Sequence, residues 1–206
     1  MSKLHGCQQL MTYSYLWKNT DTNDNIPIMQ RASFDMITLV NKITNMVFKM
    51  PIRQKATILK DLLTEITFSL LQGLMYMETQ CIVHRDIKPD NVLVLPNGDL
   101  AICDFGLAEE VANYPWVRGF RGTRSYVAPE VGTNNRYIDG HAADMFSLGR
   151  TLMACCDTWG LLPPDYVTKM CSHDPQDRPT ATSVHALLIR TWEKIPRHIQ
   201  NIVNAP

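Results

Sequence analysis

The strongest regular pattern in the chain is a run of apolar residues at helical spacing in its first half. The run comprises Leu59, Leu62, Leu63, Ile66, Leu70 and Leu74. Successive spacings of three, one, three, four and four residues place these side chains on one face of an α-helix. The pattern therefore predicts a long amphipathic helix that buries this face against a core.

Weaker patterns predict further elements ahead of this helix. Residues 8–16 alternate loosely between polar and apolar side chains and predict one strand, whereas the polar residues 18–30 predict a surface loop. The stretch from Phe34 to Phe48 predicts a second helix. It should end before Pro51, because proline disfavours the helical conformation in the residue that precedes it.

The remainder of the chain is predicted to be mainly helical, with one hairpin. Two short apolar stretches, Val92 to Leu95 and Leu100 to Cys103, flank the turn sequence Pro96-Asn97-Gly98-Asp99, in which Asn-Gly accepts positive φ at little cost. A loop-like stretch runs from about residue 104 to 130. Helices are predicted at residues 141–154, 164–171 and 181–192. The expected fold class is therefore mainly α (α+β), with a small β-hairpin and one N-terminal strand.

Composition is that of an ordinary globular domain and argues against several functions. Apolar residues make up 45% of the 206 residues, which is enough for a sizeable core. Lys+Arg and Asp+Glu number 20 each, so no net charge draws the chain to nucleic acid or to an anionic membrane, and we expect neither partner. No apolar run reaches the ~18 residues of a membrane span, and the N-terminus lacks a signal-peptide pattern. We expect an intracellular protein, cytoplasmic or nuclear, whose six cysteines are reduced thiols.

The densest group of reactive side chains follows the long helix, in His84-Arg85-Asp86-Ile87-Lys88-Pro89-Asp90-Asn91. Eighteen residues after Asp86 comes Asp104-Phe105-Gly106. Asp86 can accept a proton from a hydroxyl nucleophile, and Lys88 can neutralise a transferring phosphate. Asn91 and Asp104 supply the hard oxygen ligands that magnesium prefers. Phosphoryl transfer requires mainly positioning and charge neutralisation, which these groups can provide.

These motifs, in this order and at this spacing, resemble those of the eukaryotic protein Ser/Thr kinase family. The resemblance covers roughly residues 8–192 and implies the family's large lobe, acting on a protein substrate with ATP and Mg²⁺. It implies Asp86 as the catalytic base, with Lys88 beside it. It implies Asn91 and Asp104 as ligands of the metal that holds the nucleotide. Structural roles are implied for His84, Phe105 and Gly106.

The resemblance continues in Gly122-Thr123-Arg124-Ser125-Tyr126-Val127-Ala128-Pro129-Glu130, which looks like the loop that receives the substrate hydroxyl. In the family this glutamate pairs with a distant arginine, and Arg178 matches that position. Asp144 resembles the buried aspartate that braces the catalytic loop.

The resemblance also bears on the nucleotide and on the acceptor. Leu93 matches the position beneath the adenine ring. Lys88 together with Thr123 favours serine or threonine as the acceptor, because tyrosine kinases usually carry an Ala-Ala-Arg or Arg-Ala-Ala variant in this stretch. Lys88 would reach the phosphate and the Thr123 hydroxyl together.

The chain departs from the family's pattern at its start. The small lobe of the family supplies a Gly-rich loop, a strand lysine and a helix glutamate. None is visible, since Gly6 is the sole glycine before Gly73. Lys49 lies too near the catalytic loop to be the strand lysine and is interpreted as a solvated charge at a helix end. We therefore expect residues 1–17 to be a remnant of the small lobe and hinge, and residues 18–206 to be the large lobe.

A second departure concerns regulation. In this family an arginine at the position of Arg85 often contacts an activating phosphate, yet no Ser or Thr lies between Asp104 and Gly122. Glu109 and Glu110 can offer standing negative charge. The favoured interpretation is two exposed acids near the start of a loop.

Three hypotheses follow. The first is a Ser/Thr kinase, compact or viral-type, that transfers the γ-phosphate of ATP to a protein hydroxyl. The second is a catalytically weak or inactive lobe that acts as a decoy or regulator of another kinase, or that depends on a partner to supply a small lobe. The third is a fragment of a longer kinase. An upstream reading frame encoding glycines and Val-Ala-x-Lys would distinguish the third from the second.

Overall fold

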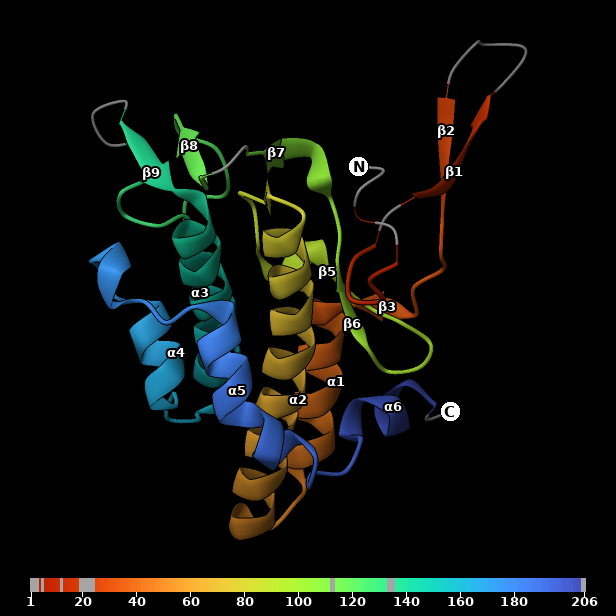
Figure 1. Cartoon of the computed structure of the whole chain (residues 1–206). Coiled ribbons are helices and arrows are strands. Elements are labelled where there is room, and N and C mark those ends of the chain that lie inside the picture. Colours follow the sequence, from red (N-terminus) through yellow and green to blue (C-terminus); the bar gives the residue numbers. More distant parts are fainter. Residues whose placement is uncertain are drawn as a thin grey trace.

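A long central helix, α2, organises the molecule (Figure 1). The computed structural model describes residues 4, 6–11, 13–18, 25–111, 114–132 and 136–204. Helix α2 spans Ile52–Thr79 and begins directly after Pro51. All six members of the predicted apolar stripe are buried. The prediction of a long amphipathic helix is therefore confirmed.

Helix α1, Met36–Phe48, confirms the second predicted helix. The carboxylate of Asp35 caps its N-terminus by accepting a hydrogen bond from the Thr38 backbone N–H at 2.7 Å. This bond satisfies one of the donors that a helix start leaves without an intrahelical partner. The two residues before the helix, Phe34–Asp35, form the short strand β3.

Three further helices lie where the pattern predicted them. Helix α3, Gly140–Trp159, packs against α2 and against α4, Asp165–Met170, whereas α5, Ala181–Trp192, packs along α2. Helix α3 runs beyond the predicted residue 154 and ends at Gly160, whose φ of 61° suits glycine.

Helix α6, His198–Val203, was not predicted. The carboxylate of Glu65 on α2 accepts hydrogen bonds from the backbone N–H groups of His198 at 3.0 Å and Ile199 at 3.3 Å. Burial raises the pKa of Glu65 to about 7. The helix is only six residues long and its capping carboxylate comes from a different helix, so local patterns do not reveal it.

The predicted hairpin is confirmed and forms two strands of a three-stranded sheet, with the first strand of the hairpin in the middle. Strands β5, Val92–Val94, and β6, Leu100–Ile102, pair antiparallel, and β3 pairs with the other edge of β5. Ser69 on α2 ties this sheet to the central helix, because its hydroxyl bonds the Leu100 carbonyl at 3.1 Å and the Leu100 N–H at 3.0 Å.

Two further sheets pair short strands that come from distant parts of the sequence. Strand β4, Ile82–Val83, pairs with β7, Glu109–Glu110, and β8, Trp116–Arg118, pairs with β9, Tyr137–Asp139. The loop predicted for residues 104–130 is therefore wrong at β7 and β8. Strands of two or three residues carry too short a pattern to be recognised without their partners.

The N-terminal region differs most from the prediction. Strands β1, Tyr13–Lys18, and β2, Asn25–Met29, form an antiparallel hairpin that extends away from the helices (Figure 1). The strand predicted at residues 8–16 is confirmed only in its later part, and the loop predicted at residues 18–30 is wrong at β2. Residues 12 and 19–24 lie outside the described residues. The predicted division between residues 17 and 18 falls inside β1.

The residues ahead of this hairpin lie against the three-stranded sheet. Ile102 donates its N–H to the Gln9 carbonyl at 2.9 Å, and its own carbonyl accepts from the Met11 N–H at 2.7 Å. Gly73 on α2 permits this approach, since a Cβ at that position would lie 3.1 Å from the Gln9 carbonyl oxygen. The N-terminal segment is thereby held beside β6, at the strand that leads to Asp104.

Two general observations complete the fold. No helix in the described part of the chain combines the length and the hydropathy that crossing a bilayer requires. The six cysteines are free thiols, and Cys155 and Cys156 are buried inside α3.

Candidate active site

A buried histidine, His84, anchors the loop between β4 and β5. The His84 side chain is fully enclosed, and its Nε2 lies 2.9 Å from the Cys103 carbonyl oxygen. Its ring contacts Phe105 edge to face, with ring centroids 4.9 Å apart. Burial lowers the pKa of His84, so the ring is held neutral. His84 therefore joins this loop to the segment that carries Asp104.

A buried carboxylate on α3 holds the same loop from the other side. Asp144 accepts hydrogen bonds from the backbone N–H groups of His84 at 2.7 Å and Arg85 at 2.9 Å. Arg85 has a positive φ of 72°, an unfavourable conformation for a residue with a side chain. Burial raises the pKa of Asp144 to about 7. The two bonds stabilise the strained turn that presents Asp86.

Asp86, Lys88 and Thr123 form a closed network. One carboxylate oxygen of Asp86, Oδ1, accepts from both the Thr123 N–H and the Thr123 hydroxyl at 2.8 Å. The other, Oδ2, lies 3.2 Å from Lys88 Nζ, which also donates to the Thr123 hydroxyl at 2.9 Å. Although burial acts to raise it, the hydrogen bonds from Thr123 and Lys88 hold the pKa of Asp86 below its ordinary value. Asp86 is therefore ionised and able to accept a proton.

Asn91 and Asp104 lie at the same end of the β5–β6 hairpin. Asn91 Nδ2 donates to the Asp86 backbone carbonyl at 2.9 Å and to Asp86 Oδ2 at 3.2 Å. The backbone carbonyl of Asn91 accepts from the Cys103 backbone N–H at 2.9 Å. Asp104 is the next residue along the chain. Asp104 adopts the left-handed conformation, and its exposed carboxylate accepts from the Gly106 N–H at 3.2 Å.

The chemistry of these donors suits a metal shared with a phosphorylated ligand. In the described part of the chain, no group of three or more His, Cys, Asp or Glu side chains is placed to hold a metal ion alone. Magnesium commonly takes only one or two protein oxygens and completes its shell with phosphates and water. The amide oxygen of Asn91 and the carboxylate of Asp104 fit that requirement.

Leu93 lies on the central strand of the three-stranded sheet. It pairs with Asp35 on β3 and Ala101 on β6, and it packs near Met11 and Leu95. The side chain is half-buried. Its role beneath adenine stays a prediction.

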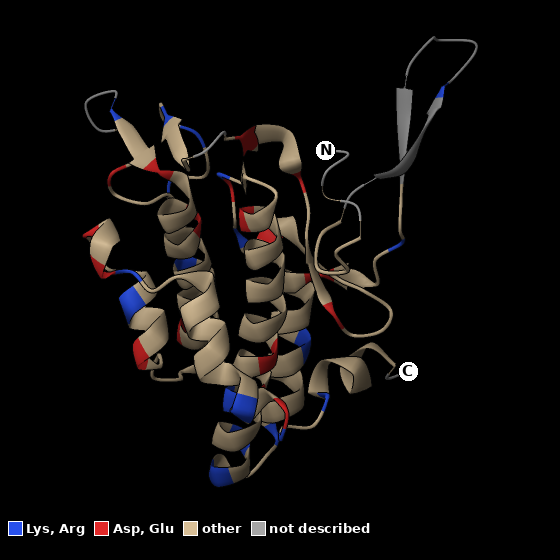
Figure 2. Ribbon diagram, viewed as in Figure 1, with Lys and Arg blue, Asp and Glu red and all other residues tan. Residues whose placement is uncertain are grey.

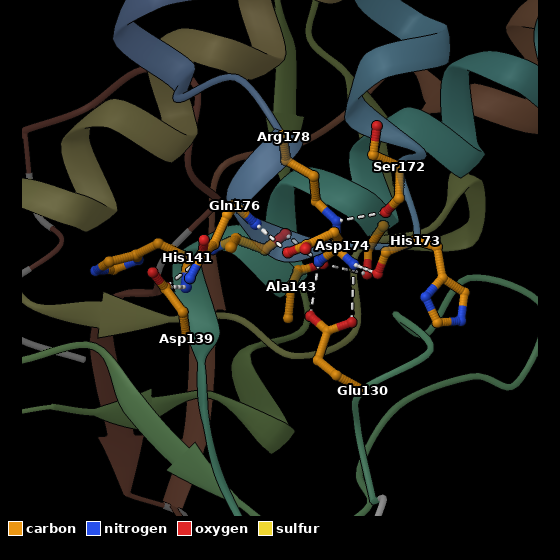
Figure 3. Close-up of polar contacts among 11 residues, drawn as sticks. Glu130, Asp139, His141, Ala143, Ser172, His173, Asp174, Gln176 and Arg178 are labelled. Carbon is orange, nitrogen blue, oxygen red and sulfur yellow. Dashed lines mark hydrogen bonds and ion pairs between the residues drawn. The ribbon is translucent and has the colours of Figure 1, made fainter.

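The loop that contains Thr123 ends in a buried ion pair, as predicted (Figure 3). Arg178 contacts Glu130 with two parallel bonds, Nη1 to Oε1 at 2.6 Å and Nη2 to Oε2 at 2.8 Å. The remaining donors of Arg178 reach three backbone carbonyls. These belong to Ala142 at 3.1 Å, Ser172 at 2.9 Å and His173 at 3.2 Å. The guanidinium is thus fully hydrogen-bonded.

A second arginine holds the earlier part of the same segment. Arg85 forms an ion pair with Glu109 through Nη1, and its Nη2 donates to the Arg118 and Gly119 carbonyls at 2.9 Å each. The interpretation of Glu109 as a mere exposed acid is therefore wrong. The alternative of standing negative charge at Glu109 agrees with this contact, but the sequence did not single it out. The partners lie 24 residues apart and meet only because β4 pairs with β7.

Residues 6–159 match the protein kinase domain family.

This chain belongs to the protein kinase family.

Among its relatives is a dual specificity mitogen-activated protein kinase kinase of Drosophila melanogaster, 32% identical over 147 residues, which are 66% of this chain and 36% of the relative. Another is mitogen-activated protein kinase 1 of Oryza sativa subsp. japonica, 32% identical over 140 residues, 68% of this chain and 35% of the relative. A MAP kinase kinase of Schizosaccharomyces pombe is 39% identical over 103 residues, 50% of this chain and 28% of the relative. The matched part of this kinase chain spans about a third of each relative.

The predicted site residues of the kinase chain fall into two groups in space. Asp86, Lys88, Asn91 and Thr123 are joined by direct hydrogen bonds, and Asp104 follows the residue bonded to Asn91. Glu130, Asp144 and Arg178 act at a distance by holding the loops that carry the first group. Lys49 follows α1 and is exposed, in agreement with its interpretation as a solvated charge.

Proposed function

We propose that this protein transfers the γ-phosphoryl group of ATP to a serine or threonine hydroxyl of a protein substrate, with Mg²⁺ as the metal. The observation that carries the proposal is the closed network of Asp86, Lys88 and Thr123. It provides an ionised carboxylate, a fixed cation and a hydroxyl within hydrogen-bond distance of one another, which is the arrangement a phosphoryl acceptor needs.

In this proposal each residue has a distinct task. Asp86 orients the acceptor hydroxyl and accepts its proton, because hydrogen bonds from Thr123 keep the carboxylate ionised and aimed. Lys88 neutralises charge on the phosphoryl group during transfer. Asn91 and Asp104 would hold magnesium, whose positive charge neutralises the phosphates. Leu93 supports the adenine ring.

The preference for serine or threonine rests on the contact between Lys88 Nζ and the Thr123 hydroxyl. The proposed partners are protein substrates and, by likeness to the relatives, other kinases of a cascade. The division into a small-lobe remnant at residues 1–17 and a large lobe at residues 18–206 remains part of the proposal.

The test measures nucleotide binding and transfer separately in the full chain. Asp86→Asn should reduce phosphoryl transfer to a mixed serine/threonine peptide library by about 10²- to 10⁴-fold, the range typical of a lost general base. It should leave ATP affinity nearly unchanged, since the base acts on the acceptor hydroxyl. Asp104→Asn should remove the magnesium dependence of ATP binding measured by calorimetry.

Asp157→Asn is the matched control, because Asp157 is an exposed carboxylate on α3. It should change neither measurement. Transfer that survives Asp86→Asn would contradict the proposed role of that residue. Magnesium-dependent ATP binding by the wild type without any transfer would favour the alternative of a non-catalytic regulator. Phosphoamino-acid analysis of the labelled peptides would reveal tyrosine as the acceptor if the Ser/Thr assignment is wrong.

A further inference from the structure

The segment around Thr123 carries a one-sided distribution of charge. Between Glu110 and Glu130 the sequence contains Arg118, Arg121 and Arg124 and no Asp or Glu. Figure 2 shows arginine, in blue, along the segment that follows β8, at the same end of the molecule as β7. The chain as a whole has no net charge, so this basic stretch is a local feature.

Two of these arginines flank the residue that contacts the proposed catalytic base. Thr123 donates to Asp86 from its backbone and from its hydroxyl, both at 2.8 Å. Arg121 and Arg124 lie two residues before and one residue after Thr123, and consecutive Cα atoms are about 3.8 Å apart. An acceptor hydroxyl that reaches Asp86 therefore lies beside a residue that is within two positions of both arginines along the segment.

These two arginines differ from the arginines that hold the segment in place. Arg85 and Arg178 are buried and paired with carboxylates. Arg121 and Arg124 are exposed, and neither takes part in an ion pair among the residues that the structure describes. A third exposed guanidinium joins them, because Arg150 on α3 donates from Nε to the Ser125 carbonyl at 3.4 Å.

Three of the acidic groups nearby are paired with cations other than Arg121 and Arg124. Glu109 and Glu130 are engaged by the two buried arginines. Asp86 is paired with Lys88 at 3.2 Å. Burial and the charge of Asp90 raise the pKa of Tyr126, whereas Arg150 and Lys88 lower it. Asp90 lies on the catalytic loop, whereas Arg121 and Arg124 flank Thr123 on its own segment. Exposed arginines are ordinary on a protein surface, but here they cluster without acidic neighbours in sequence beside the acceptor position.

We propose that the preferred substrates carry an acidic residue, aspartate or glutamate, immediately beside the serine or threonine that is phosphorylated, and that Arg124 and Arg121 contact it. This inference rests on the proposed function and adds the class of substrate. Arginine suits the task because its planar fork can bind a carboxylate with two hydrogen bonds. A lysine at the same substrate position would be repelled, which adds discrimination against basic sequences.

The test compares two peptides that differ only beside the acceptor serine, one with aspartate and one with lysine at the flanking positions. The ratio of their kcat/KM values is measured for the full chain at low ionic strength. We expect the wild type to favour the aspartate peptide by about tenfold, as each exposed pair contributes roughly two- to five-fold and repulsion acts against lysine. Raising the salt concentration should reduce the ratio, because exposed charges are screened.

Charge reversal gives the sharper readout. Arg124→Glu should shift the ratio in favour of the lysine peptide, mainly through KM, and Arg121→Glu should shift it in the same direction. Arg190→Glu is the matched control, because Arg190 is an exposed arginine on α5. It should leave the ratio as in the wild type. Should a reversed variant not fold, as judged by its melting temperature, Arg124→Gln replaces it and should bring the ratio toward one.

The outcomes separate this inference from the proposed function. If the wild type phosphorylates both peptides equally, or if the ratio is unchanged in Arg124→Glu and Arg121→Glu, the inference is overturned and the kinase assignment stands. If neither these peptides nor a mixed serine/threonine library is labelled, the proposed function fails and the inference fails with it.

Discussion

Two arginine–carboxylate pairs hold the segment between Glu109 and Glu130, and they differ in how far water reaches them. In the pair at the end of the segment, the Arg178 side chain is 1% exposed and Glu130 is 16% exposed. In the pair at its start, Arg85 is 4% exposed whereas Glu109 is 41% exposed. Both arginines are buried, so the difference lies in the carboxylates.

The hydrogen bonds that the two arginines donate also differ between the two pairs. Arg178 binds both oxygens of Glu130 and three carbonyls, one at the start of α3 and two shortly after α4 (Figure 3). Arg85 uses one nitrogen for Glu109 and the other for two carbonyls of the segment itself. Water raises the effective dielectric and weakens a partly exposed pair. The comparison indicates that the Glu130 end is a fixed structural anchor and the Glu109 end is a weaker, adjustable contact.

The largest expected effect comes from removing the buried arginine. Arg178→Ala should lower the free energy of unfolding by about 3–5 kcal/mol, because Glu130 and three carbonyls lose their donor in a region largely closed to water. Urea or thermal denaturation measures the loss. Arg178→Lys keeps the charge but not the two-pronged geometry, so it should fall between the wild type and the alanine variant. Unfolding of Arg178→Ala that coincides with wild type would remove the distinction between the two anchors.

An intermediate effect is expected at Asp144, whose carboxylate accepts a hydrogen bond from the Arg85 backbone N–H. Asp144→Asn keeps one acceptor oxygen but turns an NH₂ group toward a backbone N–H of His84 or Arg85. Leaving that buried donor unsatisfied should cost about 1–3 kcal/mol at neutral pH. Chemical denaturation of the variant beside wild type is the measurement, and an equal or higher stability would show that the turn does not depend on Asp144.

The same variant should alter the dependence of stability on pH. Burial raises the pKa of Asp144 from 3.8 to about 7, so the folded state holds a proton that the unfolded state releases in this range. Stability from this group is therefore present at low pH and is lost as the pH rises toward 7. Asp144→Asn should show a smaller fall over this range. A fall remains from Glu65, whose pKa burial also raises to about 7. Slopes that match in the two proteins would contradict the prediction.

The smallest effect is expected at the half-exposed carboxylate. Glu109→Gln should lower stability by about 1 kcal/mol or less, in the range of solvent-exposed pairs. Glu130→Gln is the matched substitution in the buried anchor and should cost clearly more. Melting temperatures of the two variants in the same buffer decide the question, and equal losses would mean that exposure of the carboxylate is not what separates the pairs.

How far the fold can be predicted depends on the length of each pattern. The stripe from Leu59 to Leu74 covers about four turns, and all of it lies within α2. The turn at Pro96-Asn97-Gly98-Asp99 sets a hairpin by local geometry alone, and β5 and β6 are found on either side of it. By contrast, the polar composition of residues 18–30 indicated a loop, yet β2 lies there. This strand is formed by its pairing with β1, which composition alone does not reveal.

The candidate site divides in the same way. Residue types and their spacing singled out Asp86, Lys88, Asn91 and Asp104 as candidates for chemistry. Resemblance to the kinase family added Thr123 and paired Glu130 with Arg178. The role of Glu109 was misjudged, since a glutamate near a loop start looks solvated until β7 is placed beside β4.

By itself, then, the sequence determined which side chains can do chemistry and where the long helices run, because both depend on residue identity and on short-range spacing. Apart from the pair of Glu130 with Arg178, which the family resemblance implied, only the tertiary structure decided which charges neutralise one another. Arg85 and Glu109 meet across two strands of two residues each, and Arg121 and Arg124 remain outside the ion pairs of the described residues. The energy of a charge depends on burial and on its nearest partner, and both are set by contacts between distant parts of the chain.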